Sequence, residues 1–325
     1  MNKVSIKDVA KAAGVSISTV SRVLNGTAPV SEELRNRVLE IVESLGYKPN
    51  ILAKGLRKGL TRTIGFIVPD ITNPFFSLMV RGAEDYLKRK DYCLIIGSSD
   101  QSEVQEERLL TTFIERVDGI IFTGTGKQNR ILDEIIKKGK KVIFLDRIIK
   151  GFNTSYVISD NYGGMKKLVE YLISKGYRKF FLINGQKETM SAQNRYKAFV
   201  DTLRENGIED FDYVFSTFTY EAGYKHAKNL SKLPDVIVSG NDLIAYGVIS
   251  ALEEMGISVP SDIAVTGYDD ILFSKHYKPA LTTVKQPMYE MGKKAAEMIM
   301  KMINEEVAQP KGIILPNEIV IRESA

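Results

Sequence analysis

The sequence predicts an α/β protein in which a small helical head precedes a body of two similar lobes. From residue 61 onward, apolar runs of strand length alternate with segments of helical periodicity. Such alternation is typical of parallel sheets covered by helices on both faces. The pattern restarts near residue 160, which indicates a second lobe. Residues 1–46 contain only short helical patterns, so they form a separate head.

The net charge of +5 is confined to the first sixth of the chain. Residues 1–60 contain ten Lys or Arg and five Asp or Glu, whereas the other 265 residues contain 35 of each sign. A basic segment in front of a neutral body is typical of a nucleic-acid-binding head. The alternative is a chance excess of charge on a solvated surface, and only motifs can decide between the two.

The composition, with 44% hydrophobic and 26% charged residues, is that of an ordinary globular protein. No apolar run approaches the roughly 18 residues of a membrane span. The first residues lack the apolar core of a secretory signal, so we expect a cytoplasmic protein with no membrane partner. The single cysteine, Cys93, lies in an apolar run, which predicts a small buried side chain and no disulfide.

Three short helices are predicted within residues 5–46. Ser5-Ile-Lys-Asp8 matches a capping box at the start of the first helix, and Gly14 ends it. Ser16 can cap a second helix, whose apolar residues are spaced to face inward at Ile17, Val20, Val23 and Leu24. A third helix follows Val30-Ser31 and ends at Gly46. A short helix, a glycine turn and a second helix form the helix-turn-helix pattern.

The second helix carries short hydroxyl side chains, one arginine and one asparagine on its other faces, at Ser18, Thr19, Ser21, Arg22 and Asn25. These groups suit close approach to base edges and phosphates in the major groove of DNA. A purely structural three-helix bundle is the alternative, but it gives no reason for this polar face.

Residues 5–25, which read SIKDVAKAAGVSISTVSRVLN, resemble the LacI/GalR family of bacterial transcriptional regulators, as do Val30-Ser31, LGYKPN at 45–50 and Ala53. The resemblance continues through nearly the whole chain. It implies sequence-specific binding to double-stranded operator DNA, with Ile17 and Ser18 where family members vary to choose their operator. The residues expected to contact DNA from the head are Ser5, Ser16, Ile17, Ser18, Thr19, Ser21, Arg22 and Asn25.

Residues 47–59, YKPNILAKGLRKG, resemble the hinge helix of the same family. The resemblance implies that Asn50, Ala53 and Leu56 face the minor groove, with Leu56 as a wedge between base steps. About eight residues are too few for an isolated helix in water, where roughly 12–15 are needed. We therefore expect this segment to fold only on operator DNA.

The alternating segments of the body form one series of strands and one of helices. The strands are expected at residues 63–69, 93–97, 119–122, 140–146, 179–184, 236–238 and 263–269. The helices are expected at residues 74–90, 103–115, 131–138, 163–176, 193–206, 243–255 and 287–304. The family resemblance implies that this body has the type I periplasmic-binding-protein fold.

The resemblance also implies the boundaries of the parts. The head is expected at residues 1–46 and the hinge at 47–60. The N-terminal lobe of the effector domain then comprises residues 61–159 and 287–316, and the C-terminal lobe comprises residues 160–286 and 317–325.

Ligands of open α/β sheets bind at the carboxyl ends of the strands, where this sequence carries aromatic, carboxylate, guanidinium and amide groups. Aromatic faces can stack on a sugar ring, and the polar groups can grip adjacent hydroxyls. Ten of these residues resemble, in order and local context, the sugar-contacting positions of periplasmic ribose-binding proteins: Asn73, Phe75, Phe76, Asp146, Arg147, Arg195, Phe218, Asn241, Asp269 and Gln286. We expect a monosaccharide effector, with ribose as the best candidate.

Each of these residues also has a purely structural interpretation. Phe75 and Phe76 can belong to the core, Asp146 and Arg147 can form a local ion pair, and Asn241 can cap a helix. The hypothesis therefore depends on the set rather than on any one member.

Alternative functions remain open at this stage. A phosphorylated carrier protein or another small effector, such as a different sugar or a purine, could control the regulator. A sugar-processing enzyme is less favoured, because Arg147 beside Asp146 would hold that carboxylate ionised, the wrong state for a general acid. A transport protein would need a secretory signal. We expect no catalytic residues, cofactor or metal.

The family resemblance implies a homodimer, and the sequence has no heptad tail for a coiled-coil tetramer. Sugar that closes the two lobes would shift the spacing of the two hinges. On family grounds we expect a repressor that sugar releases from its operator.

Overall fold

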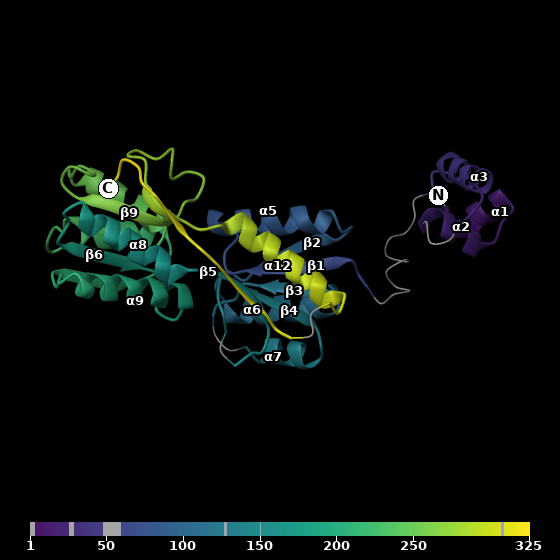
Figure 1. Cartoon of the computed structure of the whole chain (residues 1–325), viewed down its shortest axis with the longest axis horizontal. Helices are drawn as coiled ribbons and strands as arrows, with labels where there is room; N and C mark the ends of the chain where they lie inside the picture. The colour runs from purple at the N-terminus through teal and green to yellow at the C-terminus, as the bar shows by residue number, and fades with distance from the viewer. Residues whose placement is uncertain (1–3, 26–28, 48–59, 127–128, 150, 307–308) are drawn as a thin grey trace. The chain divides into compact units, whose positions relative to one another are not determined.

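The computed structural model describes the chain except residues 1–3, 26–28, 48–59, 127–128, 150 and 307–308. It divides into two compact units, Met1–Thr61 and Arg62–Ala325. In Figure 1 the first unit is made of helices, and in the second unit helices pack around β-sheets. The hinge residues Asn50, Ala53 and Leu56, and with them residues 48–59 of the proposed hinge, lie outside the described residues.

The head contains α1 (Ile6–Ala13), α2 (Ile17–Asn25) and α3 (Glu32–Ser44). The predicted capping box forms at α1, because the backbone N–H of Ser5 donates to Asp8 over 2.9 Å. Gly14 ends this helix with φ +64°, a left-handed conformation that glycine adopts without a steric penalty. The three helices bury a small apolar core made of Val9, Ala10, Ala13, Val20, Val23 and Val38.

The described residues of the body form two six-stranded sheets. The first has the order β11-β5-β4-β3-β1-β2 and is entirely parallel. The second has the order β12-β10-β9-β8-β6-β7, in which only the pair β10–β12 is antiparallel. We call each sheet with its helices a lobe.

The first lobe combines its strands with helices that pack against the sheet. The strands are β1 (Thr63–Val68), β2 (Cys93–Ser98), β3 (Gly119–Phe122), β4 (Lys141–Leu145), β5 (Ser155–Ser159) and β11 (Gly312–Leu315). The helices are α5 (Pro74–Lys88), α6 (Glu103–Ile114), α7 (Arg130–Lys137) and α12 (Met288–Ile303). Gly82 and Gly292 let α5 and α12 approach closely, because a Cβ on either glycine would lie about 2 Å from the other helix's backbone.

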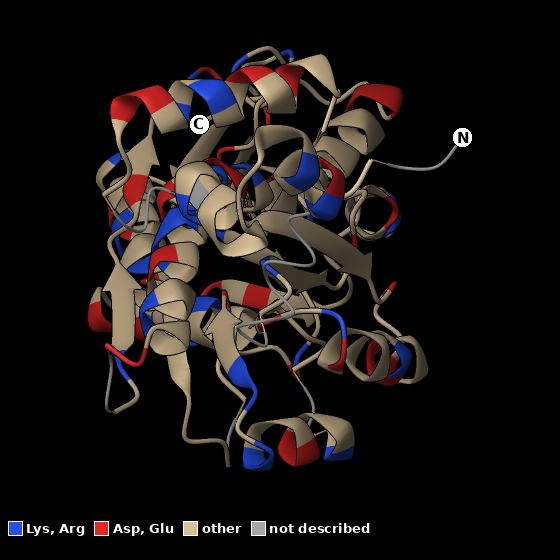
Figure 2. Cartoon of the chain, turned by 90° about the vertical axis from the view of Figure 1, so that its right-hand side faces the viewer, with Lys and Arg blue, Asp and Glu red and all other residues tan. Residues whose placement is uncertain are grey.

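The second lobe is built in the same way. Its strands are β6 (Phe180–Asn184), β7 (Phe211–Phe215), β8 (Val236–Ser239), β9 (Ala264–Asp269), β10 (Thr282–Lys285) and β12 (Glu318–Val320). Its helices are α8 (Asn161–Ser174), α9 (Met190–Glu205), α10 (Tyr220–Lys228) and α11 (Asp242–Glu254). Acidic and basic residues are interspersed on the helices of the body, in line with its zero net charge (Figure 2).

Most of the strands and helices predicted for the body occur within a few residues of their expected positions. The sequence pattern did not predict β5, β7, β11, β12 or α10, whose apolar patterns are short. The prediction that Cys93 is buried was wrong, because its side chain is exposed. Cys93 begins β2, the edge strand of the first sheet, where Ile95 and Ile96 are also exposed.

The chain passes between the lobes three times, after β5, after β10 and after β11. A buried network of side chains joins these crossovers. The Ser159 hydroxyl donates to the Gln286 Oε1 atom, and Asn161 Nδ2 donates to the Ser159 carbonyl over 3.3 Å. Asn317 Nδ2 donates to the Tyr268 hydroxyl over 2.8 Å, which in turn donates to the Asn161 carbonyl over 3.2 Å.

Candidate functional site

The N-terminal end of α2 carries a cluster of hydroxyl groups. Ser16 Oγ lies 2.7 Å from Ser18 Oγ and 2.8 Å from Thr19 Oγ1, and it accepts a hydrogen bond from the Thr19 backbone N–H over 3.1 Å. Ser16, Ser18 and Arg22 are exposed. Short donors at a helix N-terminus suit contacts to phosphate, and this cluster is held in place by its own hydrogen bonds.

Ile17 differs from the sequence expectation for the head. Its spacing predicts an inward-facing side chain, but the structure leaves 37% of it exposed. It begins α2 beside the hydroxyl cluster, so the core is filled by Val20 and Val23 instead. Exposure at this position fits the expected apolar contact with DNA. Ser5 is exposed and bonded to Asp8, and the side chain of Asn25 lies outside the described residues.

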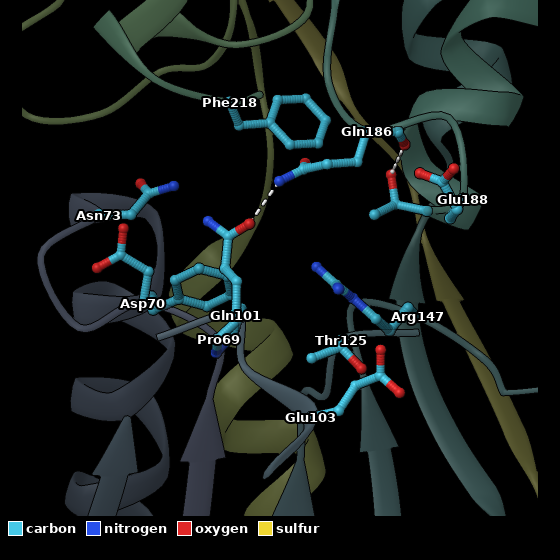
Figure 3. Close-up of a pocket in the computed structure, with 12 residues that line it drawn as sticks. Pro69, Asp70, Asn73, Gln101, Glu103, Thr125, Arg147, Gln186, Glu188 and Phe218 are labelled. Atoms are coloured by element: carbon cyan, nitrogen blue, oxygen red, sulfur yellow. Dashed lines mark hydrogen bonds between the residues drawn. The ribbon is translucent and has the colours of Figure 1, made fainter. Parts of the chain in front are cut away.

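The carboxyl ends of both sheets border a cleft that contains two neighbouring cavities. The inner cavity, of about 30 Å³, is lined by nine of the ten predicted effector residues together with Ser191. The outer cavity, of about 400 Å³, shares Asn73, Phe76, Arg147 and Phe218 with it (Figure 3). The inner cavity alone has room for roughly a water molecule or two, so a sugar ring would extend into the outer one.

Helix starts hold the aromatic residues of the inner cavity. Asn73 caps α5 by accepting a hydrogen bond from the Phe75 N–H over 3.0 Å, and Pro74 follows it in the first turn. The rings of Phe75 and Phe76 meet edge to face at 5.1 Å. In the second lobe, Asn241 caps α11 and also donates to the Phe218 carbonyl over 3.2 Å.

Arg147 and Asp146 follow β4 in the first lobe. Arg147 donates to the Gly124 carbonyl over 2.6 Å, and its other terminal nitrogen lies 3.4 Å from Asp146 Oδ2. Three polar atoms here are buried and have no hydrogen-bond partner: Arg147 Nε, Asp146 Oδ1 and Thr125 Oγ1. Unpaired buried polar atoms are costly, so a set of them beside a cavity indicates a polar ligand.

The loop that receives Arg147 is held by a buried carboxylate. Glu106 is 1% exposed and accepts hydrogen bonds from the Thr125 N–H over 2.6 Å and from Asn129 Nδ2 over 3.2 Å. Burial raises the pKa of the Glu106 carboxyl, and these two hydrogen bonds oppose the rise. Glu106 thereby fixes the loop whose Gly124 carbonyl orients Arg147.

Arg195 and Asp269 form the corresponding pair in the second lobe. Arg195 donates to Asn161 Oδ1 over 2.7 Å and to the Gly240 carbonyl over 2.5 Å, and it lies 3.8 Å from Asp269 Oδ1. Its guanidinium also stacks on the Tyr268 ring, 3.8 Å from the ring centroid. Burial raises the pKa of the Asp269 carboxyl, and the Arg195 charge opposes the rise.

Gln286 is the one predicted effector residue that lines neither cavity. It is 1% exposed, its Nε2 atom donates to Asp269 Oδ1 over 2.7 Å, and its Oε1 atom accepts from Ser159. It therefore lies behind Asp269 and within the network of the crossovers. Asp269 itself has φ +119°, a strained conformation for a residue with a side chain.

Several residues that line the outer cavity were not predicted from the sequence: Asp70, Gln101, Glu103, Thr125, Gln186, Glu188 and Thr189. Figure 3 shows Gln101 and Gln186 reaching toward each other from the two lobes, with Gln186 Nε2 donating to Gln101 Oε1 over 2.5 Å. Polar residues follow β2 directly, so the strand-end rule applied there could have found Gln101.

Among the described residues, no group of three or more His, Cys, Asp or Glu side chains could hold a metal ion. Within the same part of the chain, no helix is long and apolar enough to cross a membrane.

Known families and proteins match both units. The family profile "bacterial regulatory proteins, lacI family" matches residues 5–50, and "periplasmic binding protein-like domain" matches residues 169–325. The chain is 37% identical over 324 residues to the ribose operon repressor of Bacillus subtilis, with 98% of each protein covered. It is 36% identical over 327 residues to the transcriptional regulator RegA of Clostridium saccharobutylicum, again with 98% of each covered.

A solved structure has the same fold as the body. It is a LacI-family transcriptional regulator from Enterococcus faecium with bound ribose, 29% identical, with a TM-score of 0.74 over 81% of this chain and 98% of that one. The two sequence relatives match this chain over almost their whole length. The chain therefore belongs to the LacI family of bacterial regulatory proteins and is a DNA-binding regulator of transcription.

Proposed function

We propose that the chain represses sugar-utilisation genes and that a monosaccharide bound between its two lobes, with ribose as the best candidate, controls its affinity for operator DNA. The observation that carries the proposal is the inner cavity. It gathers Phe75, Phe76 and Phe218 around two arginine–aspartate pairs, and polar atoms of the first pair have no partner. A sugar needs aromatic side chains on which its ring can stack, and hydrogen-bond donors and acceptors beside them for its hydroxyl groups.

Two relatives support ribose over other sugars. One is named a ribose operon repressor, and the ribose-bound regulator shares the fold of the body. The boundaries proposed for the parts are those given above, with the lobes meeting at residues 159–160, 286–287 and 316–317. The chain would act in the cytoplasm of a bacterium, as a homodimer with two heads on one operator.

The residues proposed to bind the sugar are Asn73, Phe75, Phe76, Asp146, Arg147, Arg195, Phe218, Asn241 and Asp269. Gln286 would act through Asp269, to which it donates a hydrogen bond. The residues proposed to bind DNA are those of the head and hinge given above. Closure of the lobes on a sugar would change the crossover network and, through it, the spacing of the two heads.

Calorimetric titration of the full chain with ribose, xylose, galactose and glucose tests the effector. We expect ribose to bind most tightly. If ribose failed to bind while a purine or a disaccharide bound clearly, the proposal for the effector would be wrong.

Band-shift titration of operator DNA with and without ribose tests the direction of the response, and we expect ribose to release the DNA. Tighter operator binding in the presence of ribose would instead show corepression. A pull-down with a phosphorylated carrier protein, with and without ribose, tests the rival mode of control. We expect no stable complex, and the regulator to have no catalytic activity toward the sugar.

A further inference from the structure

We infer that the cleft selects for uncharged sugars and rejects their phosphate esters. This inference rests on the proposed sugar site and adds a criterion of charge to it. Its basis is the outer cavity, whose lining includes three carboxylates, at Asp70, Glu103 and Glu188, and one cation, Arg147 (Figure 3). A phosphate ester carries nearly two negative charges at pH 7, so it would meet an acidic opening.

The inner cavity does not compensate for this charge. Its two arginines are matched by Asp146 and Asp269, and all four of these side chains are buried. Arg195 already contacts Asn161, the Gly240 carbonyl and Asp269. The two cavities together contain five carboxylates and two guanidinium groups, so the lined space has an excess of negative charge.

The helix N-termini at this cleft are also poorly suited to phosphate. A helix N-terminus binds phosphate through its unpaired backbone N–H groups. At α5, α6 and α9, however, the capping side chain already accepts a hydrogen bond from one of these N–H groups. Asn73 accepts from the Phe75 N–H at α5. Ser102 accepts from the Gln105 N–H at α6, and Thr189 accepts from the Ala192 N–H at α9. Glu103 and Glu188 add negative charge beside two of these ends.

The same cavity remains favourable for a neutral polyol. Arg147 Nε, Asp146 Oδ1 and Thr125 Oγ1 are buried and unpaired, and Arg147 and Thr125 line the outer cavity. Gln101 and Gln186 add amide donors and acceptors from both lobes. Hydroxyl groups can satisfy all of these atoms, because each hydroxyl both donates and accepts. The lining thus attracts hydroxyl groups and repels anions. This combination allows the site to bind a sugar and to reject the phosphate ester of the same sugar.

Paired titrations of the full chain test this inference, with ribose against ribose 5-phosphate and glucose against glucose 6-phosphate. We expect each ester to bind at least about tenfold more weakly than its parent sugar, and the difference to shrink at high salt as the charges are screened. Inorganic phosphate should not compete with ribose.

A charge-removal variant sharpens the test. Asp70→Asn, Glu103→Gln and Glu188→Gln together should lower the ratio of the two dissociation constants, ester over sugar, by at least about fivefold. The matched control, Glu115→Gln with Glu209→Gln and Glu253→Gln, removes three exposed carboxylates outside both cavities and should leave the ratio unchanged.

An ester that bound the unaltered chain as tightly as its parent sugar would overturn the inference while leaving the sugar site in place. An unchanged ratio in the charge-removal variant would also overturn it. If none of the neutral sugars bound, the inference and the proposed function would both fail.

Discussion

The two arginines of the cleft come from different elements of the two lobes, Arg147 from the loop after β4 and Arg195 from α9, and they differ in their surroundings. Arg147 in the first lobe contacts one backbone carbonyl and its neighbour Asp146, and its Nε atom is unpaired. Arg195 in the second lobe contacts three groups and lies on the ring of Tyr268. The difference suggests a division of work, in which Arg147 has free capacity for a ligand and Arg195 links the ligand to the crossovers.

Replacement of each arginine by lysine tests this division most directly. Arg195→Lys cannot reproduce the planar fork or the stacking, so it leaves Asn161 or Asp269 without its partner. We expect ribose affinity to fall by ~100-fold or more, equivalent to ~2.7 kcal/mol. Arg147→Lys keeps a cation beside Asp146 and should cost only about tenfold. Calorimetry on both variants measures these losses, and equal losses would refute the division.

Each lobe also has a buried carboxylate, and the two hold different parts of the structure in place. Glu106 in the first lobe holds the loop that carries Gly124, within reach of the cleft. Asp242 in the second lobe is fully buried and accepts hydrogen bonds from Ile271 N, Ser274 Oγ and Thr283 Oγ1 over 2.6–2.9 Å. It thereby fastens the segment after β9 and the strand β10 to the start of α11.

Because Asp242 is buried, we expect the stability of the body to depend on pH. Burial raises the pKa of Asp242 to about 6, against 3.8 for an ordinary aspartate. Because the folded chain binds this proton more tightly than the unfolded chain, the free energy of unfolding should fall as pH rises from about 4 to about 6 and then level off. The fall attributable to this group is roughly 3 kcal/mol.

Denaturant unfolding of the full chain at pH 4, 5, 6 and 7 measures this effect, provided that the transition of the body is followed separately. Asp242→Asn removes the titration and should flatten that part of the curve. Asp210→Asn, at an exposed position, is the control and should leave the curve unchanged. A curve of identical shape in Asp242→Asn would show that Asp242 does not titrate in this range.

The sequence predicted those parts of the site that depend on local position, but not the contacts between residues that lie far apart in the chain. Asp146 and Asp269 could be predicted at the cleft because they lie at the ends of β4 and β9, and the ends of parallel strands meet at one edge. Phe75 could be predicted because the segment after β1 leads into the start of α5. Glu106 could not be found in this way, because its partners Thr125 and Asn129 lie about twenty residues away and meet it only in the folded lobe. Gln286 was found by position, but its bond to Ser159 could not be predicted from the sequence.

The fold was predicted well where a periodic pattern was long and poorly where it was short. α5 and α12 have apolar stripes of four turns, and they were placed within two residues at each end. β5 and β7 have five residues each and no clear alternation. Cys93 was misplaced because an apolar run does not distinguish a central strand from an edge strand.

We expect Glu106→Gln to lower ribose affinity less than either arginine replacement does. The amide can still accept from Thr125 N, but its NH₂ group then faces the donor of Asn129, so the loop and Arg147 lose part of their support. We expect ribose affinity to fall by about fivefold, equivalent to about 1 kcal/mol. Glu107→Gln, at the next and exposed position of α6, is the matched control and should bind ribose normally. Loss of stability without loss of ribose affinity would assign Glu106 a structural role only.

We expect Tyr268→Phe to cause the smallest change in ribose affinity. This variant tests the coupling between ribose binding and operator binding. The variant keeps the ring on which Arg195 stacks, but it removes the hydroxyl that joins Asn161 and Asn317 across two crossovers. Ribose affinity should therefore change by less than about threefold, while the effect of ribose on operator affinity should shrink by a larger factor. Calorimetry and band-shift titration on the same preparation separate the two quantities. If both fell together, Tyr268 would serve the binding site alone; if only the response fell, the hydroxyl network would be the physical link between the sugar and the movement of the lobes.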